Sequence, residues 1–439
     1  MRITKLQIAN LRSFSNAEFH FQPGFNLIVG VNGVGKSTLL DTLRVCTSRI
    51  LPLISESKSR SISFSVHDIR NNQPFLDIDM SFEHAANDFR FIRRQWRVNR
   101  AIYDEKNTEK LRREILDSNR LRDHPRDLLR ELDSPLSTLD QDNILPSKLD
   151  LKKCKTISMV APNCIFFSTS RSIVSNAVAT KSRAVGNEAA SYAEALSSRP
   201  IYLSQFAEWM RAQEGISSEH YLSAKHLQVM RSTVRQFLPG YENLRADPID
   251  PRRLLIDKDG IPLDAKQLSD GERGVLALVL DLARRLSQAN PKLDDPLQNG
   301  EAIVLIDEID LHLHPKWQRE IVHKLTNTFP KCQFIATTHS PQIIGEVGHD
   351  RIQIISDSFV YSPEHSFGID SSRVLEEIMD SLPRNERTQK LLVAISHNID
   401  VKKFMEARSL LSDLKQQVGE NDPEVIRIDT LLGFMENSS

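Results

Sequence analysis

The sequence predicts an α/β fold with a mostly parallel core sheet, and three observations lead to this prediction. Residues 25–43 (FNLIVGVNGVGKSTLLDTL) read as a buried strand, a glycine-rich loop and the first turns of a helix. Between residues 268 and 337, apolar strands alternate with helical segments, which is typical of parallel sheets. Residues 1–100 hold many segments in which apolar and polar residues alternate, and these predict further strands.

The predicted elements change in character along the chain. Strands are expected at 2–8, 17–21, 26–29, 61–66, 75–82 and 89–98. Residues 104–153 are highly charged and helical in pattern, and residues 202–238 read as two helices. We therefore expect four parts: a strand-rich lobe at 1–100, an inserted, mainly helical arm at 101–240, a second lobe at 241–365, and a helical tail at 366–439 for oligomerisation or partner binding.

The composition argues against several classes of protein. Acidic and basic residues nearly cancel in the 439-residue chain, at 58 against 57, so bulk charge gives no attraction to nucleic acid. The four cysteines form no C-x-x-C pair, which argues against a zinc site or a disulfide framework. No apolar run reaches membrane-spanning length and residues 1–14 lack a signal-peptide core, so we expect a soluble, cytoplasmic protein.

The glycine-rich loop matches the phosphate-binding pattern G-x-x-x-x-G-K-[ST] from Gly30 to Ser37. Gly33 and Gly35 would let the backbone curl, so that its N–H groups and the following helix N-terminus attract phosphate oxygens. Lys36 would place a positive charge on the β- and γ-phosphates, and Ser37 would offer a hydroxyl to Mg²⁺. The alternative is a strand-to-helix turn without a ligand, which the flanking strand and helix disfavour.

Three further motifs carry chemistry downstream. Asp307 and Glu308 end a buried strand, where Asp307 can hold Mg²⁺ through a water and Glu308 can orient and deprotonate an attacking water. Ser269 opens LSDGER directly before a helix, an arrangement that suits phosphate, although an ordinary helix N-cap has the same pattern. His339 follows the last buried strand and can sense a γ-phosphate; the alternative is a histidine satisfied within a loop.

In this order, GVNGVGKST, LSDGE, VLIDEIDLHLHP and TTHSP resemble the motifs of the non-transporter ABC-type ATPases of the SMC and RecF-like class. The opening LQIANLRSFSNAEFHF is also similar to theirs, and the resemblance covers roughly residues 1–100 and 240–350. It implies an ABC-type P-loop ATPase head that uses ATP and Mg²⁺. It also implies a homo-oligomer, in which two heads sandwich two ATPs and each site combines one subunit's phosphate loop with the other's LSDGE.

The resemblance assigns roles to individual residues of this chain. The ATP-binding residues would be Arg12, Gly30, Asn32, Gly33, Val34, Gly35, Lys36, Ser37 and Thr38. The metal would be held by Ser37 and Asp307, and the catalytic residues would be Glu308 and His339. The signature that acts on the partner's γ-phosphate would be Ser269, Asp270, Gly271 and Glu272. Asp310 would lie in the loop that crosses the dimer interface.

One position departs from the family's pattern. The family usually has a glutamine that contacts Mg²⁺ after a strand, and the matching segment here, 167–171 (FSTSR), has none. That metal ligand is left open. Arg171 either contacts phosphate or the partner, or is a simple surface arginine.

Residues 89–100 (FRFIRRQWRVNR) interleave arginines with aromatic residues. Such a strand could contact nucleic acid, with arginines on phosphates and Trp96 stacking on a base. The alternative is a half-buried strand with a solvated arginine face, and we favour it.

A narrower resemblance comes from PKWQREIV, FGIDSS and the tail, which look like the ATPases of bacterial anti-phage operons. They are closest to PtuA, the ATPase subunit of the Septu system, which also occurs in retron operons and works with a separate HNH nuclease, PtuB. The leading hypothesis is thus an ATPase whose ATP-driven dimerisation regulates such a nuclease, with no membrane partner. The alternative is an SMC- or RecF-like ATPase that acts directly on DNA in repair or recombination. A nuclease site within the chain is disfavoured, because no HNH-like Cys/His set is present and no Glu plus Asp-x-Asp cluster follows His339.

Overall fold

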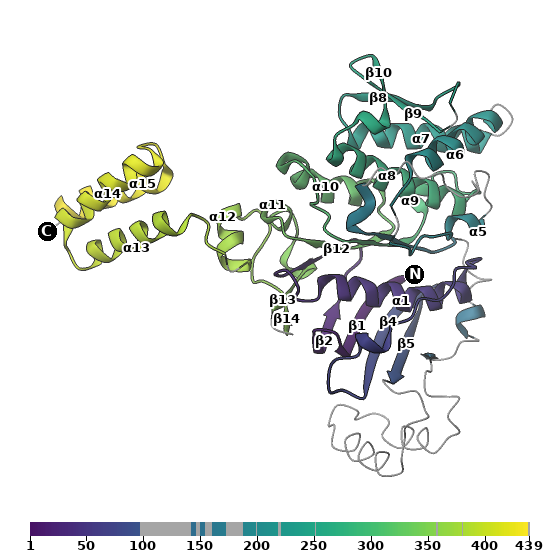
Figure 1. The fold of residues 1–439 in the computed structure, drawn as a ribbon, viewed down its shortest axis with the longest axis horizontal. Coiled ribbons are helices and arrows are strands. Elements are labelled where there is room, and N and C mark those ends of the chain that lie inside the picture. The colour runs from purple at the N-terminus through teal and green to yellow at the C-terminus, as the bar shows by residue number, and fades with distance from the viewer. Residues whose placement is uncertain are drawn as a thin grey trace, which may run out of the picture. The chain divides into compact units, whose positions relative to one another are not determined.

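The structure is a computed structural model that forms two compact units, Met1–Gly368 and Ile369–Ser439. It describes residues 1–96, 142–145, 150–153, 160–172, 188–198, 200–217, 221–250, 252–356, 359–379 and 381–437. The first unit contains three sheets, and the second is helical (Figure 1). Within these described ranges, no helix is long and apolar enough to cross a bilayer.

An antiparallel sheet of five strands forms the N-terminal lobe of the first unit. In spatial order its strands are β2 (Phe14–His20), β1 (Arg2–Leu11), β4 (Phe75–His84), β5 (Asn87–Trp96) and β6 (Asp142–Leu145). Burial alternates along β4, because successive side chains point to opposite faces of a strand. The inward-facing residues, such as Leu6, Ile78 and Phe91, are fully buried in one core with the apolar face of α1 (Lys36–Ile54).

The second sheet has six strands, and all but one of them run parallel. In spatial order they are β14 (Phe359–Tyr361), β13 (Ile352–Ser356), β3 (Phe25–Val29), β12 (Cys332–Thr338), β11 (Ala302–Ile306) and β7 (Asn163–Phe167). Every residue of β3, β11 and β12 is buried, since α1 covers one face and α8 (Asp270–Ala289) lies on the other (Figure 1). The α/β class with a strand-rich first lobe and a mostly parallel core sheet is therefore confirmed.

The parallel pairing decides where the functional loops lie. Val29 pairs with Thr338, and Ile306 pairs with both Ala336 and Phe167. The carboxyl ends of β3, β12, β11 and β7 thus share one edge of the sheet. Loops that follow such strand ends form the binding crevice of open parallel sheets. The glycine-rich loop and the segments after Ile306, Thr338 and Phe167 are gathered there.

A third layer packs on the far side of α8. It contains α6 (Leu203–Ile216) and α7 (Tyr221–Phe237), the two helices expected at 202–238, and both contact α8. Beyond them lies a three-stranded antiparallel sheet of β8 (Tyr241–Ala246), β9 (Leu254–Lys258) and β10 (Ile261–Asp264). Shorter or connecting helices are η1 (Val66–Asp68), η4 (Thr169–Ser172), α5 (Glu188–Ser191), η5 (Ala265–Gln267), α9 (Pro296–Asn299), α10 (Pro315–Thr328), α11 (Pro341–Ile344) and η6 (His349–Arg351).

The range expected to form an inserted arm, 101–240, is described only in part. Most of the charged helical region expected at 104–153 lies outside the described residues, as do residues 97–100 at the end of the basic segment. Within the described part, β6 and β7 belong to the five- and six-stranded sheets. Cys154 also lies outside, and Cys46, Cys164 and Cys332 are buried free thiols.

The prediction of a strand at 61–66 is wrong. Residues 61–65 are not assigned to a strand, and the helical turn η1 begins at Val66. Side chains bond the backbone instead: Ile62 N donates to Ser48 Oγ over 2.9 Å, and Gln95 Nε2 donates to Phe64 O over 3.0 Å. The apolar alternation was informative about burial, since Phe64 faces the core, but it could not reveal that side chains take the place of a strand.

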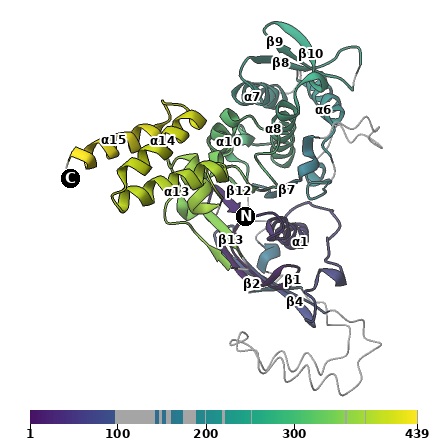
Figure 2. The ribbon, with the colours of Figure 1, turned by 60° about the vertical axis from the view of Figure 1, so that its left-hand side comes forward.

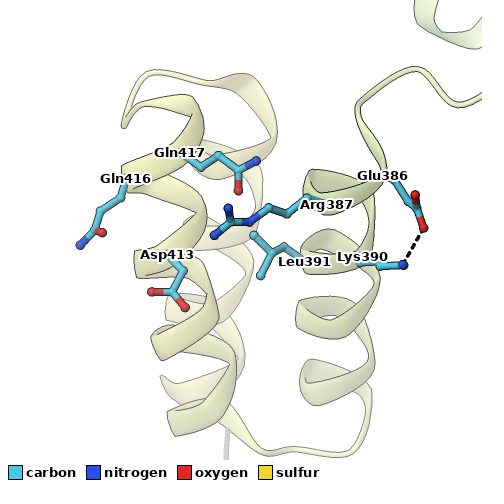
Figure 3. Close-up of a pocket in the computed structure, with 7 residues that line it drawn as sticks. All are labelled: Glu386, Arg387, Lys390, Leu391, Asp413, Gln416 and Gln417. Atoms are coloured by element: carbon cyan, nitrogen blue, oxygen red, sulfur yellow. Dashed lines mark hydrogen bonds and ion pairs between the residues drawn. The ribbon is translucent and has the colours of Figure 1, made fainter.

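The second unit is built from helices. They are α12 (Ser371–Arg373), the π-helical turn η7 (Val374–Ile378), α13 (Glu386–Asp400), α14 (Phe404–Val418) and α15 (Pro423–Asn437). The middle helix α14 contacts both α13 and α15 around a core that includes Ile395, Leu411 and Ile428 (Figure 2). This confirms the helical C-terminal region. An open, mostly polar cleft between α13 and α14 is lined by Glu386, Arg387, Lys390, Leu391, Asp413, Gln416 and Gln417 (Figure 3).

Candidate nucleotide-binding site

The phosphate loop joins β3 to α1 through a backbone that only glycine adopts readily. Gly33 and Gly35 have φ angles of 81° and 121°, which L side chains rarely adopt. A Cβ on Gly35 would also lie 2.6 Å from Cζ of Phe14. Asn32 is exposed and Val34 is half-buried in the same loop. The curled backbone therefore requires glycine at 33 and 35, as the pattern predicted.

Lys36 closes this loop from the first turn of α1. Its Nζ donates to Gly30 O over 2.8 Å and to Val31 O over 2.9 Å. Burial lowers the pKa of Lys36, and the nearby carboxylates of Asp307, Glu308 and Asp310 act in the opposite direction. The ammonium thus lies between the loop backbone and a group of acidic residues, where it can also form an ion pair with a phosphate.

Both predicted metal ligands meet beside the loop. Ser37 Oγ donates to Asp307 Oδ2 over 3.0 Å, and Thr337 Oγ1 donates to Asp307 Oδ1 over 2.7 Å. Hydroxyl and carboxylate oxygens are ligands that Mg²⁺ accepts, together with phosphate and water. Among the described residues, no group of three or more His, Cys, Asp or Glu could hold a metal by itself. The oxygens of Ser37 and Asp307 fit an ion that takes its other ligands from a nucleotide and solvent.

Glu308 follows Asp307 in an unusual backbone conformation. Its φ angle is 48°, a left-handed value that is strained for a residue with a side chain. The Glu308 N–H donates to Thr337 Oγ1 over 2.7 Å, so the fully buried Thr337 contacts both members of the acidic pair. Its carboxylate is half-buried and contributes to the field at Lys36. Sequence reasoning included Thr337 in a motif but gave it no role.

Arg171 is neither a surface arginine nor, in this structure, a free phosphate ligand. It follows β7, is 5% exposed, and donates to Asp307 O and Glu308 O, each over 2.6 Å. It also donates to Ser168 O over 3.2 Å. Burial lowers the pKa of Arg171 to about 10, so the guanidinium is still charged at neutral pH. A buried cation therefore holds the backbone that carries the two acidic side chains.

His339 and Asp310 meet at the end of β12. Asp310 Oδ1 accepts from Thr338 Oγ1 over 2.6 Å and from the His339 N–H over 3.3 Å. Burial, and then the charge of Lys36, lower the pKa of His339, so its ring is neutral at neutral pH. Asp310, expected in the loop that crosses a dimer interface, is bonded within its own chain here.

Arg12 lies beside the first turn of α1, as expected of a residue near the nucleotide. Its guanidinium donates to Asp41 and Asp68, each over 2.9 Å, and approaches Thr38 Oγ1 at 3.5 Å. The two carboxylates raise the pKa of Arg12 against the effect of its burial. Arg12 is therefore anchored beside Thr38 by two aspartates that sequence reasoning did not identify.

The signature residues lie at the N-terminus of α8 and bond to their own surroundings. Ser269 caps α8, and Glu272 accepts from both Ser269 and Tyr241. Asp270 is exposed and pairs with Arg273, and a Cβ on Gly271 would lie 2.3 Å from His312 O. Among the described residues, none of these side chains hydrogen-bonds to residues 30–38. The structure thus brings together every predicted site residue except the signature.

The basic strand is neutralised by partners on neighbouring strands. Arg90 pairs with Asp79, Arg94 Nη2 donates to Asp77 over 2.9 Å, and Arg93 Nη1 donates to Asp142 over 2.7 Å. Trp96 packs against Phe75 with ring centroids 5.0 Å apart. In the part of this segment that the structure describes, the arginines and the tryptophan are therefore engaged within the sheet. The half-buried strand that we favoured is present, but its arginines are paired rather than merely solvated.

Two family models match most of the first unit. A model described as "AAA domain" matches residues 5–197, and one described as "AAA domain, putative AbiEii toxin, Type IV TA system" matches residues 166–345. Together they span the phosphate loop, the acidic pair, the signature and His339.

Individual relatives match shorter stretches. Retron Ec83 probable ATPase of Escherichia coli is 37% identical over 223 residues, which are 49% of this chain and 40% of that protein. Septu protein PtuA of Bacillus mycoides (strain KBAB4) is 50% identical over 76 residues, 17% of this chain and 10% of that protein. A solved SmcHead bound to the C-winged helix domain of ScpA is 15% identical with a TM-score of 0.47, over 82% of this chain and 97% of that chain. The matched stretches span well under two thirds of the two curated relatives, the retron ATPase and PtuA. Together with the motif order, the family matches support an ABC-type AAA ATPase, and retron and Septu ATPases are among the proteins to which the chain is similar.

Proposed function

We propose that this chain binds and hydrolyses ATP with Mg²⁺ as a homodimer, and that ATP-driven closure of two heads regulates a partner nuclease of the HNH type in anti-phage defence. The observation that carries the ATPase part is the hydrogen-bonded series Ser37–Asp307–Thr337 beside Lys36. It joins the phosphate loop to the acidic pair at the carboxyl edge of a parallel sheet, where nucleotides bind in such folds. The retron and Septu names of the relatives support the defence part.

Each residue of the site then has a task in hydrolysis. Lys36 exchanges the carbonyls of Gly30 and Val31 for phosphate oxygens of ATP. Ser37 and Asp307 would hold Mg²⁺, which supplies charge neutralisation at the phosphates. Glu308 orients the attacking water and takes its proton, while Arg171 fixes the backbone of Glu308. The neutral ring of His339 can hydrogen-bond to the γ-phosphate or the water.

Among the described residues, the signature makes no hydrogen bond to the phosphate loop of its own chain, which supports a site shared by two chains. In an isologous pair, the same two surfaces meet twice, so each Ser269 would face the ATP held by the partner. The Ser269 side chain is located at the N-terminus of the 20-residue helix α8, whose N–H groups and dipole favour an anion. One chain would therefore bind ATP but would hydrolyse it only after closure.

Mixing two inactive variants tests this arrangement. Ser269→Arg keeps the phosphate loop but places a large charged side chain in the signature. Lys36→Ala keeps the signature but disables the phosphate loop. We expect each variant alone to lack ATPase activity, while ATP binding to separate Ser269→Arg subunits is unchanged. An equal mixture should recover activity, because a mixed pair has one intact site, giving roughly a quarter of the wild-type sites if chains exchange at random.

The outcome of the mixture separates the two arrangements. A mixture that stays inactive although mixed pairs form, as shown with two affinity tags, contradicts the shared site. ATPase activity of Ser269→Arg alone contradicts it as well. Lys331→Ala, at an exposed lysine of the same unit, is the matched control and should behave as wild type in both assays.

The helical tail is the part of the chain that we propose binds the partner. Large apolar side chains are exposed on all three of its long helices, with Val393 60%, Met405 83% and Ile426 53% exposed. A partner bound to the tail would cover these side chains. The arginines described in the basic strand, in contrast, offer no support for direct DNA binding, because each of them pairs with an aspartate.

Coexpression with an HNH nuclease encoded by a neighbouring gene tests this part. We expect the two proteins to purify as one complex, and we expect its stability or nuclease activity to differ between ATP and ADP, because only ATP favours closed heads. Two proteins that elute separately with either nucleotide would contradict the partnership. If the chain alone shifts a DNA fragment in a gel mobility assay, the repair alternative is favoured.

A further inference from the structure

The hydroxyl of Ser269 is already engaged within its own helix. Ser269 Oγ donates to Glu272 Oε2 over 2.8 Å, and the Ser269 N–H donates to the same oxygen over 2.9 Å. The Glu272 N–H approaches Ser269 Oγ at 3.4 Å, which completes a capping box. A serine hydroxyl has one proton. Ser269 therefore cannot donate to Glu272 and to a phosphate at the same time.

The charge of Glu272 would also oppose a phosphate. Burial alone would raise the pKa of Glu272, but hydrogen bonds from Tyr241 and Ser269 outweigh it, and the pKa is lowered. The side chain is thus a carboxylate at neutral pH, and like charges a few ångströms apart repel. If the signature is to bind a phosphate, the Glu272 carboxylate must be kept in place and its negative charge must be compensated.

Two residues of the three-stranded sheet provide that compensation. Tyr241 OH donates to Glu272 Oε1 over 2.7 Å, and Lys258 Nζ donates to Tyr241 OH over 2.9 Å. Lys258 Nζ also lies 3.9 Å from the Glu272 carboxylate and 4.8 Å from the centroid of the Tyr241 ring. Tyr241 is 3% exposed, so its hydroxyl has a fixed position. Oε1 of Glu272 remains bonded whichever way the Ser269 hydroxyl points.

We propose that the Ser269 hydroxyl is a two-position donor, which turns from Glu272 to the partner's phosphate when two heads close, and that Tyr241 and Lys258 are positioning residues that hold Glu272 during this exchange. The inference rests on the proposed function, because the phosphate belongs to the ATP bound by the other chain. No covalent bond changes. Ser269 replaces a carboxylate acceptor by a phosphate oxygen, and Glu272 keeps the bonds from Tyr241 and from the Ser269 N–H. Without Tyr241 and Lys258, Glu272 would retain the hydroxyl and repel the phosphate.

Removing the Tyr241 hydroxyl tests the exchange. Tyr241→Phe keeps the buried ring, and Tyr361→Phe removes a hydroxyl from a half-exposed tyrosine of β14 as the matched control. We expect Tyr241→Phe to lower kcat for ATP about tenfold, the usual effect of losing one hydrogen bond to a charged group. The affinity of separate subunits for a fluorescent ATP analogue should not change. Thermal unfolding of both variants shows whether the fold is kept.

A second pair of substitutions distinguishes charge compensation from a merely structural role. Lys258 is about half exposed, so Lys258→Met should fold, and we expect it to lower kcat several-fold while Lys258→Arg restores most of it. Adding Glu272→Gln removes the charge that Lys258 compensates but keeps an acceptor for the cap. The double variant should therefore hydrolyse ATP faster than Lys258→Met alone, a rescue that a structural role of Lys258 would not give.

The outcomes separate this inference from the proposed function. Wild-type kinetics of Tyr241→Phe, or equal rates of Lys258→Met with and without Glu272→Gln, overturn the inference. The proposed function would survive an overturned inference, provided that wild type hydrolyses ATP and Ser269→Arg does not. If wild type lacks ATPase activity, or if Ser269→Arg keeps it, the proposed function itself fails.

Discussion

Replacing Lys36 by alanine is expected to abolish ATP binding. The substitution removes two hydrogen bonds that close the phosphate loop, 2.8 Å to Gly30 O and 2.9 Å to Val31 O, together with the charge that would meet the β- and γ-phosphates. Hydrogen bonds to charged groups each contribute several-fold to more than a hundredfold in affinity. We therefore expect the Kd for ATP to rise by at least about a hundredfold.

Calorimetric titration of the purified protein with a slowly hydrolysed ATP analogue and Mg²⁺ measures this loss. Lys331→Ala removes an exposed lysine directly before β12 and should bind as wild type. Unchanged affinity in Lys36→Ala would contradict the assignment of the loop as the nucleotide site. Thermal unfolding without nucleotide should be similar for both variants if the loss is one of binding.

Changing Glu308 to glutamine is expected to stop hydrolysis while leaving binding intact. The amide has nearly the shape of the carboxylate but cannot accept the proton of the attacking water. Loss of a general base lowers a rate by about 10²- to 10⁴-fold. The backbone at 308 should keep its left-handed conformation, because Thr337 and Arg171 hold it through its own N–H and carbonyl groups. ATP should then accumulate on closed pairs of heads.

Steady-state phosphate release measures the loss of hydrolysis. Light scattering after size exclusion, with and without ATP, measures the accumulation of closed pairs. Glu320→Gln, at a partly exposed glutamate that pairs with Lys324 on α10, should hydrolyse ATP normally. A normal rate in Glu308→Gln would rule out Glu308 as the base. An inactive variant that remains monomeric with ATP would instead contradict the link between ATP and closure.

The parts of the site that follow a strand directly were predictable from the sequence. β3, β11 and β12 appear as short apolar runs because both faces of the core sheet are covered. The phosphate loop is readable because Gly33 and Gly35 adopt backbone angles that few other residues tolerate. Asp307 and Glu308 were identifiable as an acidic pair at a strand end.

The contacts that orient these residues were not predictable, because they depend on pairing between distant segments. Arg171 reaches the carbonyls of Asp307 and Glu308 only because β7 pairs in parallel with β11. Asp142 neutralises Arg93 from β6, a strand too short for periodicity to reveal. Tyr241 reaches Glu272 of α8 from strand β8 of the three-stranded sheet. Local pattern predicts an element, but it does not say which element becomes its neighbour.

The packing of Gly271 determines which substitution can report on the signature alone. A Cβ at this position would lie 2.3 Å from the carbonyl oxygen of His312, in the segment that follows Asp310. A larger residue at 271 would displace that segment in the same polypeptide, and it would also alter the surface offered to a second head. Loss of activity in a Gly271 variant would thus have two indistinguishable origins. The hydrogen bonds of Ser269 stay within its own helix, which makes Ser269 the unambiguous position for genetic dissection of the signature.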